Sequence, residues 1–559
     1  MTKILVVLLT IPIFISLMRS GFYPMQDDLQ AFRVHQMFKC LQDLQIPCRW
    51  IPDMGYQYGY PQFNFYPPSI YYFAAFLHLF SIQIIDTVKI LFILGSIIST
   101  ITMFIFLKAL LKDSFSSLVG SLLYSYIPYK AVEIYVRGSL SEFWAYAFFP
   151  LIFWSSFQLI SKGKLRYISW FGLSLALLLI THNLMSFIFF PLVGVWSLTL
   201  MTVLKKWSIL PKLILGAFLG LGLAGFFILP VVFEGKYVHL ETLLGGYFDY
   251  RQHFVNLYQI FLSYNFGYGS SMLGPNDDLS LSTGIIHWVL GALALILAAV
   301  YFKKDKTLSI ITFSLGILTL VTLFMMHEKS SFIWERIPPL FYLQFPWRFL
   351  SDSTFLLSIL GGIAIYRLGK IQSKLGLGLG VLAIIILFTM YAPFFKPKSW
   401  LKINDSDKFS NQSWEKQLTI SIFDYLPIFA KLPPNKKAPQ LPEVLDGDVK
   451  FISYKKGSNY QIGEVEVGEK ATLRLPLFDF PGMEVKVDNQ KIEHIHTDCR
   501  MEEYCLGLIT FRVLEGKHKI EARLENTPIR TLGNIITVVS FFALVSIFIL
   551  GKNEKYNPA

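Results

Sequence analysis

Residues 87–107, TVKILFILGSIISTITMFIFL, form an apolar run broken only by Lys89, and about 20 such residues span a bilayer as a helix. Further runs of this kind lie at 4–19, 114–128, 143–160, 167–180, 186–204, 209–230, 284–302, 307–326, 346–366, 376–394 and 531–550. No small-residue cleavage site follows the first run, so it is expected to be a span rather than a signal peptide. The pattern predicts a polytopic α-helical membrane protein with about twelve transmembrane helices.

The composition also indicates a membrane protein. Of the 559 residues, 53% are hydrophobic and 16% are charged, whereas soluble domains carry about 25% charged residues. The mean hydropathy is +0.49. These values exclude a cytosolic enzyme, a disordered chain and a disulfide-stabilised miniprotein.

The formal net charge of +12 arises in the short loops between the apolar runs. The basic residues of these loops are Lys108, Lys112, Lys162, Lys164, Arg166, Lys205, Lys206, Lys212, Lys303, Lys304, Lys306, Arg367, Lys370 and Lys374. Such clusters mark cytoplasmic loops by the positive-inside rule, so both termini are expected in the cytoplasm. The charge therefore reports topology, and no nucleic-acid partner is expected.

With this topology three long segments face outward: a first outer loop at 20–86, a second at 231–283 and a soluble region at 395–530. The aromatic-rich residues 67–84 are expected to form a helix in the outer membrane interface, because a span there would invert every later loop. An ordinary span, with another run miscounted, is the alternative.

The soluble region is rich in Lys, Glu, Asp and Pro, and from about residue 447 apolar and polar residues alternate. Turn signals at Asp488-Asn489 and Glu515-Gly516 separate the alternating segments. We expect a small extracytoplasmic β-sandwich here. A transmembrane domain at 1–394 precedes this region, and a final transmembrane helix with a cytoplasmic tail follows at 531–559.

All four cysteines lie in segments that are predicted to face outward. Cys40 and Cys48 are close in the first outer loop, and Cys499 and Cys505 are close in the β-region. Two locally spaced pairs in an oxidising compartment suggest two disulfides, with free thiols as the alternative.

Ionisable side chains near the membrane are costly, so those at the outer ends of the spans are candidates for function. Asp27 and Asp28 directly follow the first span, where a carboxylate could act as the general base for an acceptor hydroxyl. The alternative is a solvated helix cap. The same two acids are the candidate ligands for a divalent cation, Mg²⁺ or Mn²⁺, although nothing in the sequence requires a cofactor.

Two arginines are candidate phosphate ligands. Arg137 lies near helical spacing from Glu133 and Glu142, and Arg348 lies at the outer mouth of a late span. A guanidinium at the bilayer surface is suited to a phosphate or pyrophosphate. The alternatives are an internal Arg–Glu ion pair for Arg137 and snorkelling for Arg348.

Further polar and aromatic residues are candidate substrate contacts. Arg49 and Tyr60 belong to a Gly- and Pro-rich aromatic loop, suited to stacking on a sugar or lipid head group or to forming an interfacial belt. His182 lies at the outer end of a span, where a helix-end hydrogen bond is the alternative role. Gln344 and Trp347 precede Arg348. The absence of P-loop and GxGxxG motifs argues against nucleotide-driven chemistry in the cytoplasm.

Several motifs follow one another in a fixed order: Asp27-Asp28, RWIPD (49–53), GYQYGYPQFNFYPP (55–68), YVRGSLSE (135–142), THN (181–183), QFPWRFL (344–350) and DYLP (424–427). Over about residues 1–430 the chain thereby resembles the GT-C superfamily of membrane glycosyltransferases. More narrowly, it resembles bacterial membrane proteins labelled 6-pyruvoyl-tetrahydropterin synthase-related. Where the family pattern has a His-Asp pair, this chain has Asp27-Asp28.

The resemblance implies a GT-C-like transferase in the plasma membrane with an outward-facing site. Such an enzyme moves a hexosyl or pentosyl group, usually with inversion, from a polyprenyl-phosphate donor to an envelope glycan, lipid or protein. Carried over by motif, the expected roles are Asp28 as base, Asp27 as second acid, Arg137 and Arg348 as phosphate ligands, and Glu142 and His182 as supporting residues.

Two other functions stay open. A transporter or lipid flippase would place paired charges at mid-membrane and show internal symmetry, whereas here the ionisable residues gather at the outer ends. A non-enzymatic envelope assembly protein would use the β-domain as a binding module.

Overall fold

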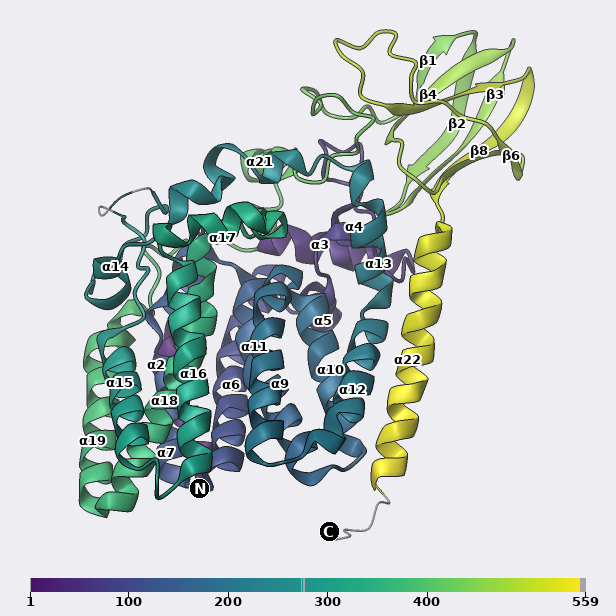
Figure 1. The fold of residues 1–559 in the computed structure, drawn as a ribbon. Coiled ribbons are helices and arrows are strands. Elements are labelled where there is room, and N and C mark those ends of the chain that lie inside the picture. The colour runs from purple at the N-terminus through teal and green to yellow at the C-terminus, as the bar shows by residue number, and fades with distance from the viewer. Residues whose placement is uncertain (1, 273, 275–276, 553–559) are drawn as a thin grey trace.

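The computed structural model describes residues 2–272, 274 and 277–552, so the expected cytoplasmic tail lies outside the described residues. An upright bundle of helices carries a β-domain at one end, which we call the outer end (Figure 1). Helix α1 begins and helix α22 ends at the opposite end of the bundle. A polytopic membrane protein with a C-terminal β-domain is therefore confirmed in this coarse form.

The apolar runs form the helices of the bundle. These are α1 (Thr2–Leu8), α2 (Ile11–Phe14), η1 (Ile15–Met18), α6 (Ile84–Leu111), α7 (Ser114–Ser125), α9 (Leu140–Lys162), α10 (Arg166–Thr181), α11 (Asn183–Val203), η3 (Trp207–Ile209), α12 (Leu210–Leu223), α13 (Gly225–Glu234), α15 (Ile285–Val300), α16 (Lys306–Met325), α18 (Phe349–Ile371), α19 (Ser373–Ile386), η11 (Leu387–Tyr391), η12 (Ala392–Phe394) and α22 (Pro528–Lys552).

Helix length supports fewer spans than the twelve that the sequence predicts. Within the described part of the chain, seven helices are long and apolar enough to cross a membrane, or eight if one bent pair counts as a span. The bend, of 72°, separates Trp207–Leu223 from Gly225–Tyr237. The other runs form short helices, such as the 12-residue α7, because an apolar run that packs inside a bundle need not be a full span.

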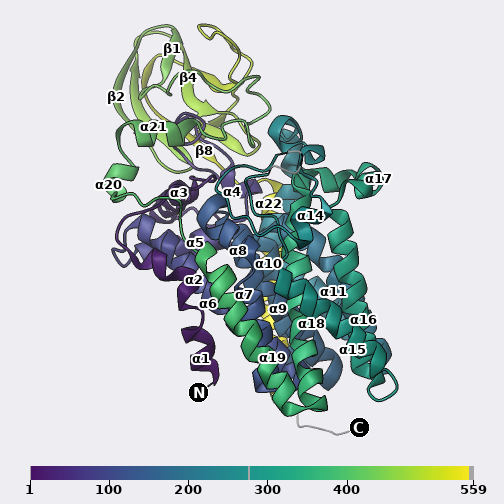
Figure 2. The same ribbon diagram turned by 90° about the vertical axis from the view of Figure 1, so that its left-hand side faces the viewer.

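Short helices cover the outer end of the bundle. They are α3 (Gln30–Gln42), α4 (Gln62–Phe65), α5 (Ser69–His78), α8 (Pro128–Val132), η2 (Glu133–Arg137), η4 (Gly235–Tyr237), η5 (Glu241–Leu243), η6 (Gly246–Phe248), η7 (Tyr250–His253), α14 (Leu257–Phe261), η8 (Glu328–Ser330), α17 (Ser331–Arg336), η9 (Pro338–Leu343), η10 (Pro346–Arg348), α20 (Asp405–Lys408) and α21 (Asn411–Thr419). Trp414 of α21 packs against Phe32 of α3, and Figure 2 shows α21 between α3 and the β-domain.

The predicted interfacial helix at 67–84 is shorter in the structure. Helix α5 has ten residues, a length of about 15 Å, which is too short to cross a bilayer. It ends at His78 because a turn intervenes and Ile84 already begins α6. Phe76 and Phe80 at its end are exposed, as an interfacial helix requires.

The β-domain consists of two antiparallel sheets. Their strands are β1 (Glu443–Asp446), β2 (Val449–Lys456), β3 (Tyr460–Val467), β4 (Ala471–Phe478), β5 (Met483–Val487), β6 (Gln490–Ile492), β7 (Leu508–Val513) and β8 (Gly516–Leu524). The strand orders are β1-β4-β7 and β2-β3-β8-β5-β6. Asp488 and Asn489, both at positive φ, turn β5 into β6, and Gly516 begins β8 after β7.

Candidate active site

A cavity of about 890 Å³ lies where the outer segments meet the outer ends of α9, α11 and α13. The sequence candidates on its wall are Asp27, Arg137, Glu142, His182, Gln344, Trp347 and Arg348. These residues come from segments more than 300 positions apart, so the fold brings most of the predicted site together. Asp28, Arg49, Tyr60 and Glu133 are not among the lining residues.

Glu142 binds both predicted phosphate ligands. Its Oε2 accepts hydrogen bonds from Arg137 Nη1 at 2.9 Å and Arg348 Nε at 3.2 Å, and its Oε1 accepts one from the Tyr129 hydroxyl at 3.0 Å. Arg137 also pairs with the buried Glu133. Both guanidiniums therefore already have carboxylate partners, as the ion-pair alternative predicts for Arg137. Snorkelling does not describe Arg348, because its side chain is buried.

Asp27 is a more open carboxylate. Its Oδ2 accepts hydrogen bonds from Arg33 Nη1 at 2.8 Å and Gln30 Nε2 at 2.7 Å, and a third of its side chain is exposed. Among the described residues no donor is bonded to Oδ1. The backbone amide of Asp27 donates to the Arg137 carbonyl at 2.8 Å, which fixes this loop against the arginine cluster. Asp27 can therefore present one oxygen to a molecule in the cavity.

Asp28, the favoured base in the sequence, points to a different partner. Its Oδ2 accepts from Lys408 Nζ of α20 at 2.7 Å, and it does not line the cavity. The two neighbouring acids, which lie just before α3, thus face in different directions, and their adjacency in the sequence does not reveal this. Since Asp27 and Asp28 each bind a separate cationic side chain, they do not fit a shared site for a divalent cation.

Asp424 is a lining residue that the sequence analysis did not select as a site residue. Burial raises the pKa of Asp424 to about 6, with the neighbouring Asp27 adding to the rise and Arg33 opposing it. A carboxyl group that titrates near neutrality can exchange a proton in a reaction. The only signal in the sequence was its place at the start of the DYLP motif.

His182 caps a helix at the cavity wall. It is the N-cap of α11, and its Nδ1 accepts from the Met185 amide at 3.1 Å. Burial lowers the pKa of His182 to about 3, so the ring is neutral and carries its proton on Nε2. The helix-end role that the sequence left as an alternative is therefore what the structure shows.

Arg49 and Tyr60 lie outside the cavity wall. Arg49 donates to Asn64 Oδ1 at 3.1 Å and to Asn534 Oδ1 of α22 at 3.0 Å, which joins the first outer loop to the last helix. Tyr60 is fully buried, and its hydroxyl donates to the Ser421 carbonyl at 3.4 Å. Tyr60 is therefore part of the packed core, whereas Phe65, Tyr66 and Pro67 of the same aromatic loop line the cavity.

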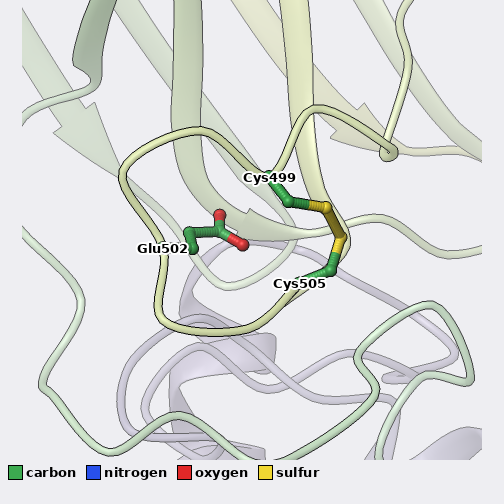
Figure 3. A group of neighbouring side chains, drawn as sticks. All are labelled: Cys499, Glu502 and Cys505. Carbon is green, nitrogen blue, oxygen red and sulfur yellow. A yellow bond between two sulfur atoms is a disulfide. The ribbon is translucent and has the colours of Figure 1, made fainter.

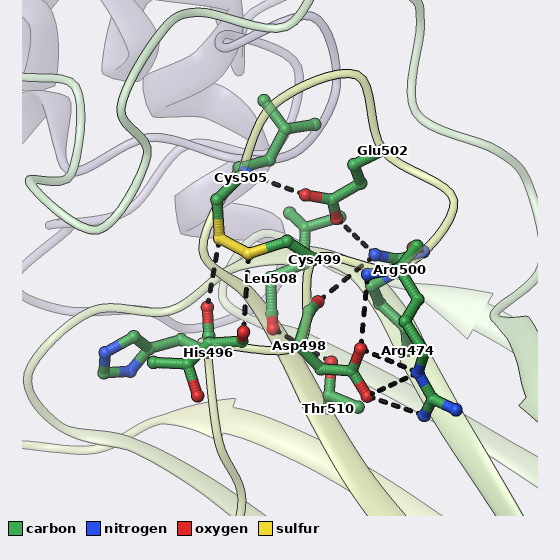
Figure 4. Close-up of a disulfide and its surroundings, with 11 residues drawn as sticks. Arg474, His496, Asp498, Cys499, Arg500, Glu502, Cys505, Leu508 and Thr510 are labelled. Carbon is green, nitrogen blue, oxygen red and sulfur yellow. Dashed lines mark hydrogen bonds and ion pairs between the residues drawn. A yellow bond between two sulfur atoms is a disulfide. The ribbon is translucent and has the colours of Figure 1, made fainter.

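The cysteines form two disulfides, Cys40–Cys48 and Cys499–Cys505. Glu502 lies close to the second pair, and the three side chains together have metal-ligand spacing (Figure 3). Disulfide sulfurs are not thiolate ligands, and Glu502 is bound by Arg474 Nη1 at 2.5 Å and by the Leu506 amide at 2.8 Å. Figure 4 shows the disulfide within a hydrogen-bonded loop, so this group is not a metal centre in the structure.

The fold and the cavity define a polytopic membrane protein with a pocket of charged and apolar side chains at one end of its helical bundle. Residues 63–395, more than half of the chain, match the model of the 6-pyruvoyl-tetrahydropterin synthase related domain, a membrane protein family. The chain belongs to this family.

One solved structure that is similar to this chain is the Archaeoglobus fulgidus oligosaccharyltransferase in complex with Zn and sulfate. The TM-score is 0.44 and the sequence identity 11%, over 80% of this chain and 59% of the archaeal protein. The chain thus spans about three-fifths of the length of that protein. Among curated proteins, none matches this chain.

Proposed function

We propose that this protein is a membrane glycosyltransferase of the GT-C type. It transfers a hexosyl or pentosyl group from a polyprenyl-phosphate donor to an envelope glycan, lipid or protein on the outer face of the plasma membrane. The observation that carries the proposal is the composition of one cavity wall, where an accessible carboxylate, cationic side chains and membrane-facing apolar residues lie together.

The apolar part of the wall supports a donor with a lipid chain. Leu184 and Phe187 of α11 and Val231 and Val232 of α13 line the cavity. Phe187 is 41% and Val232 64% exposed, so these side chains are open both to the cavity and to the surroundings of the bundle. Helix α11 is long and apolar enough to cross a membrane. In a bilayer its exposed apolar face would contact lipid, and an amphiphile could reach the cavity from there.

In the proposed reaction Asp27 is the general base. Its open Oδ1 takes the proton of the acceptor hydroxyl, whose oxygen forms a bond to the anomeric carbon. The bond between that carbon and the phosphate oxygen breaks, and polyprenyl phosphate leaves with the electron pair. A single displacement of this kind inverts the anomeric configuration. Arg33 donates to the other oxygen, Oδ2, and so orients the carboxylate of Asp27.

The remaining polar groups would hold the reactants. Arg137 and Arg348 are fixed by Glu142, so their positive charge is preorganised on the wall without needing to move during the reaction. Neutral His182 offers its Nε2 proton as a donor. The described carboxylates do not require a divalent cation for this step.

The proposal is tested with the full-length protein in lipid nanodiscs and radiolabelled polyprenyl-phosphate glucose, mannose, galactose and arabinose as donors. Release of polyprenyl phosphate is measured, with and without added envelope glycan. Asp27→Asn is expected to lower the rate by about 10²–10⁴-fold, the range for loss of a general base. Asp28→Asn is the matched control, because it makes the same chemical change next to the cavity but outside its wall.

Equal rates for folded Asp27→Asn and wild-type protein would refute the base assignment. If no sugar leaves any of the donors while the protein moves the intact donor lipid across the bilayer, the protein is a flippase instead. Added Mg²⁺, Mn²⁺ or EDTA is expected to change the wild-type rate by less than about twofold, since Asp27 and Glu142 on the wall are already paired with arginines.

A further inference from the structure

The cations on the cavity wall differ in whether a carboxylate neutralises them. Arg33 is paired with Asp27, Arg137 with Glu133 and Glu142, and Arg348 with Glu142. Lys236 also lines the cavity, yet it has no carboxylate within ion-pair distance in the part of the chain that the structure describes. Its ammonium lies over the ring of the adjacent Tyr237, 5.1 Å from the centroid.

Lys236 lies where polar and lipid-facing surfaces meet. It belongs to the short turn η4, which directly follows the bent helix α13. Val231 and Val232, one turn earlier, line the same cavity. An amphiphile whose apolar chain rests on these valines would therefore place its charged end near Lys236. Because this lysine is exposed and not yet paired, its charge is available to a ligand.

The backbone around Lys236 is fixed on both sides. Glu234, two residues earlier, is buried and accepts from Arg530 Nε and from Asn64 Nδ2, both at 2.9 Å. On the other side, the carbonyl of Tyr237 accepts from the Ile428 amide at 3.0 Å. Thus α22 and the segment that carries Asp424 both hold the turn, and only the lysine side chain is free to adjust to a ligand.

We propose that Lys236 is the phosphate-binding residue of the cavity and that its ligand is a lipid phosphate entering along α13. This inference rests on the proposed function but changes its expected phosphate ligands, since Arg137 and Arg348 already have carboxylate partners. Lys236 supplies the uncompensated positive charge, and the paired arginines shape the pocket around the phosphate. The phosphodiester of the donor and the phosphomonoester that remains after transfer are both anions, so either can bind the unpaired ammonium of Lys236.

The test measures binding of undecaprenyl phosphate, which carries no sugar, to the full-length protein in nanodiscs by native mass spectrometry. Lys236→Gln is expected to raise the Kd at least tenfold, while Lys236→Arg keeps it within about threefold because the charge is retained. Undecaprenol, which lacks the phosphate, is expected to bind both variants and the wild type equally. Lys431→Gln is the control, since it removes an exposed lysine of the neighbouring segment that does not line the cavity.

Two competition arms distinguish the sources of phosphate. Inorganic phosphate at 10 mM and a background of phosphatidylglycerol in the nanodisc are both expected to leave undecaprenyl phosphate bound. Displacement by inorganic phosphate would overturn the lipid assignment, and an unchanged Kd in Lys236→Gln would overturn the role of the lysine. Because no sugar is present, these results do not depend on transfer. Lys236-dependent binding without transfer from any donor would refute only the proposed function.

Discussion

The two walls of the cavity hold similar residues in different states. On one wall, formed by η2, the start of α9 and η10, the Glu142 side chain is 1% exposed and binds two arginines that are themselves buried. On the other, from the first outer loop, the Asp27 side chain is 33% exposed and uses one oxygen for Arg33. Both carboxylate oxygens of Glu142 already accept hydrogen bonds, whereas Asp27 has one oxygen, Oδ1, to which no described donor is bonded.

This difference separates groups that build the pocket from groups that can react. A buried carboxylate that already bonds three donors has no lone pair well placed for a substrate proton, and breaking its pairs is expensive. A carboxylate that is half engaged can bind a proton without leaving its partners. We therefore propose that the wall with Asp27 and Asp424 takes part in the reaction and that the wall with Glu142 keeps the pocket rigid.

The largest expected effect is on the wall with Glu142. Glu142→Gln removes the one carboxylate that is paired with Arg348 among the described residues, and one of the two that are paired with Arg137. Because both guanidiniums are buried, this change is expected to lower the free energy of unfolding by about 3–5 kcal/mol. Asp27→Asn is expected to lower it by only about 1–2 kcal/mol, because its carboxylate is partly solvated. Denaturant titration in detergent micelles measures both values.

The control for this comparison is Glu515→Gln, the same change at an exposed position of the β-domain, which is expected to be neutral within about 0.5 kcal/mol. If Glu142→Gln and Asp27→Asn destabilise the protein equally, the two walls do not differ in the way proposed.

The next effect is a pH dependence from the wall with Asp27 and Asp424. The pKa of Asp424 is about 6 in the folded protein, and an unfolded aspartate titrates near 3.9. Between about pH 4 and 6 the folded state holds more protons than the unfolded state, so stability falls as the pH rises. Above pH 6 Asp424 is ionised in the folded state, and the cost of burying its charge lowers the stability of the wild type. Asp424→Asn avoids this cost and is therefore expected to be more stable than the wild type by about 1–3 kcal/mol.

Unfolding titrations between pH 4 and 8 measure this difference, which is expected to vanish near pH 4. Asp448→Asn, at an exposed acid of the β-domain, is expected to follow the wild-type profile. Parallel profiles for Asp424→Asn and the wild type would show that the site of Asp424 does not shift its titration.

The sequence predicted the helices and the β-region better than it predicted the site. Apolar runs and turn residues act locally, and the turn at Asp488-Asn489 lies where the pattern placed it. Motif order also selected Arg137, Glu142 and Arg348, which meet in space. The sequence could not show that Asp28 turns toward Lys408 while Asp27 faces the cavity, because the direction depends on packing against a segment 380 residues away.

Lys236 and Asp424 were missed for a related reason. In the sequence, a lone lysine after a span looks like any loop residue. Lys236 stands out only when the arginines of the cavity wall are seen to be paired with carboxylates and the lysine is not. The importance of Asp424 depends on burial by distant segments, which its own neighbourhood in the chain does not reveal. Which ionisable groups of the cavity wall are paired, and which are not, depends on contacts between distant segments. It can be determined only when the partners of every such group are known.

The smallest expected effect concerns His182, which lies on the cavity wall but serves as a helix cap. Asn is among the best N-cap residues, so His182→Asn is expected to keep the free energy of unfolding within about 0.5 kcal/mol of the wild type. His182→Ala removes the acceptor for the Met185 amide and is expected to cost about 1 kcal/mol. The rate at which polyprenyl phosphate is released from the donor is then compared between the two variants. This comparison separates a role of His182 in the reaction from its role as a helix cap. If capping is the whole role, His182→Asn retains the wild-type rate; a large loss in this stable variant would place His182 with Asp27 among the groups that contact the substrate.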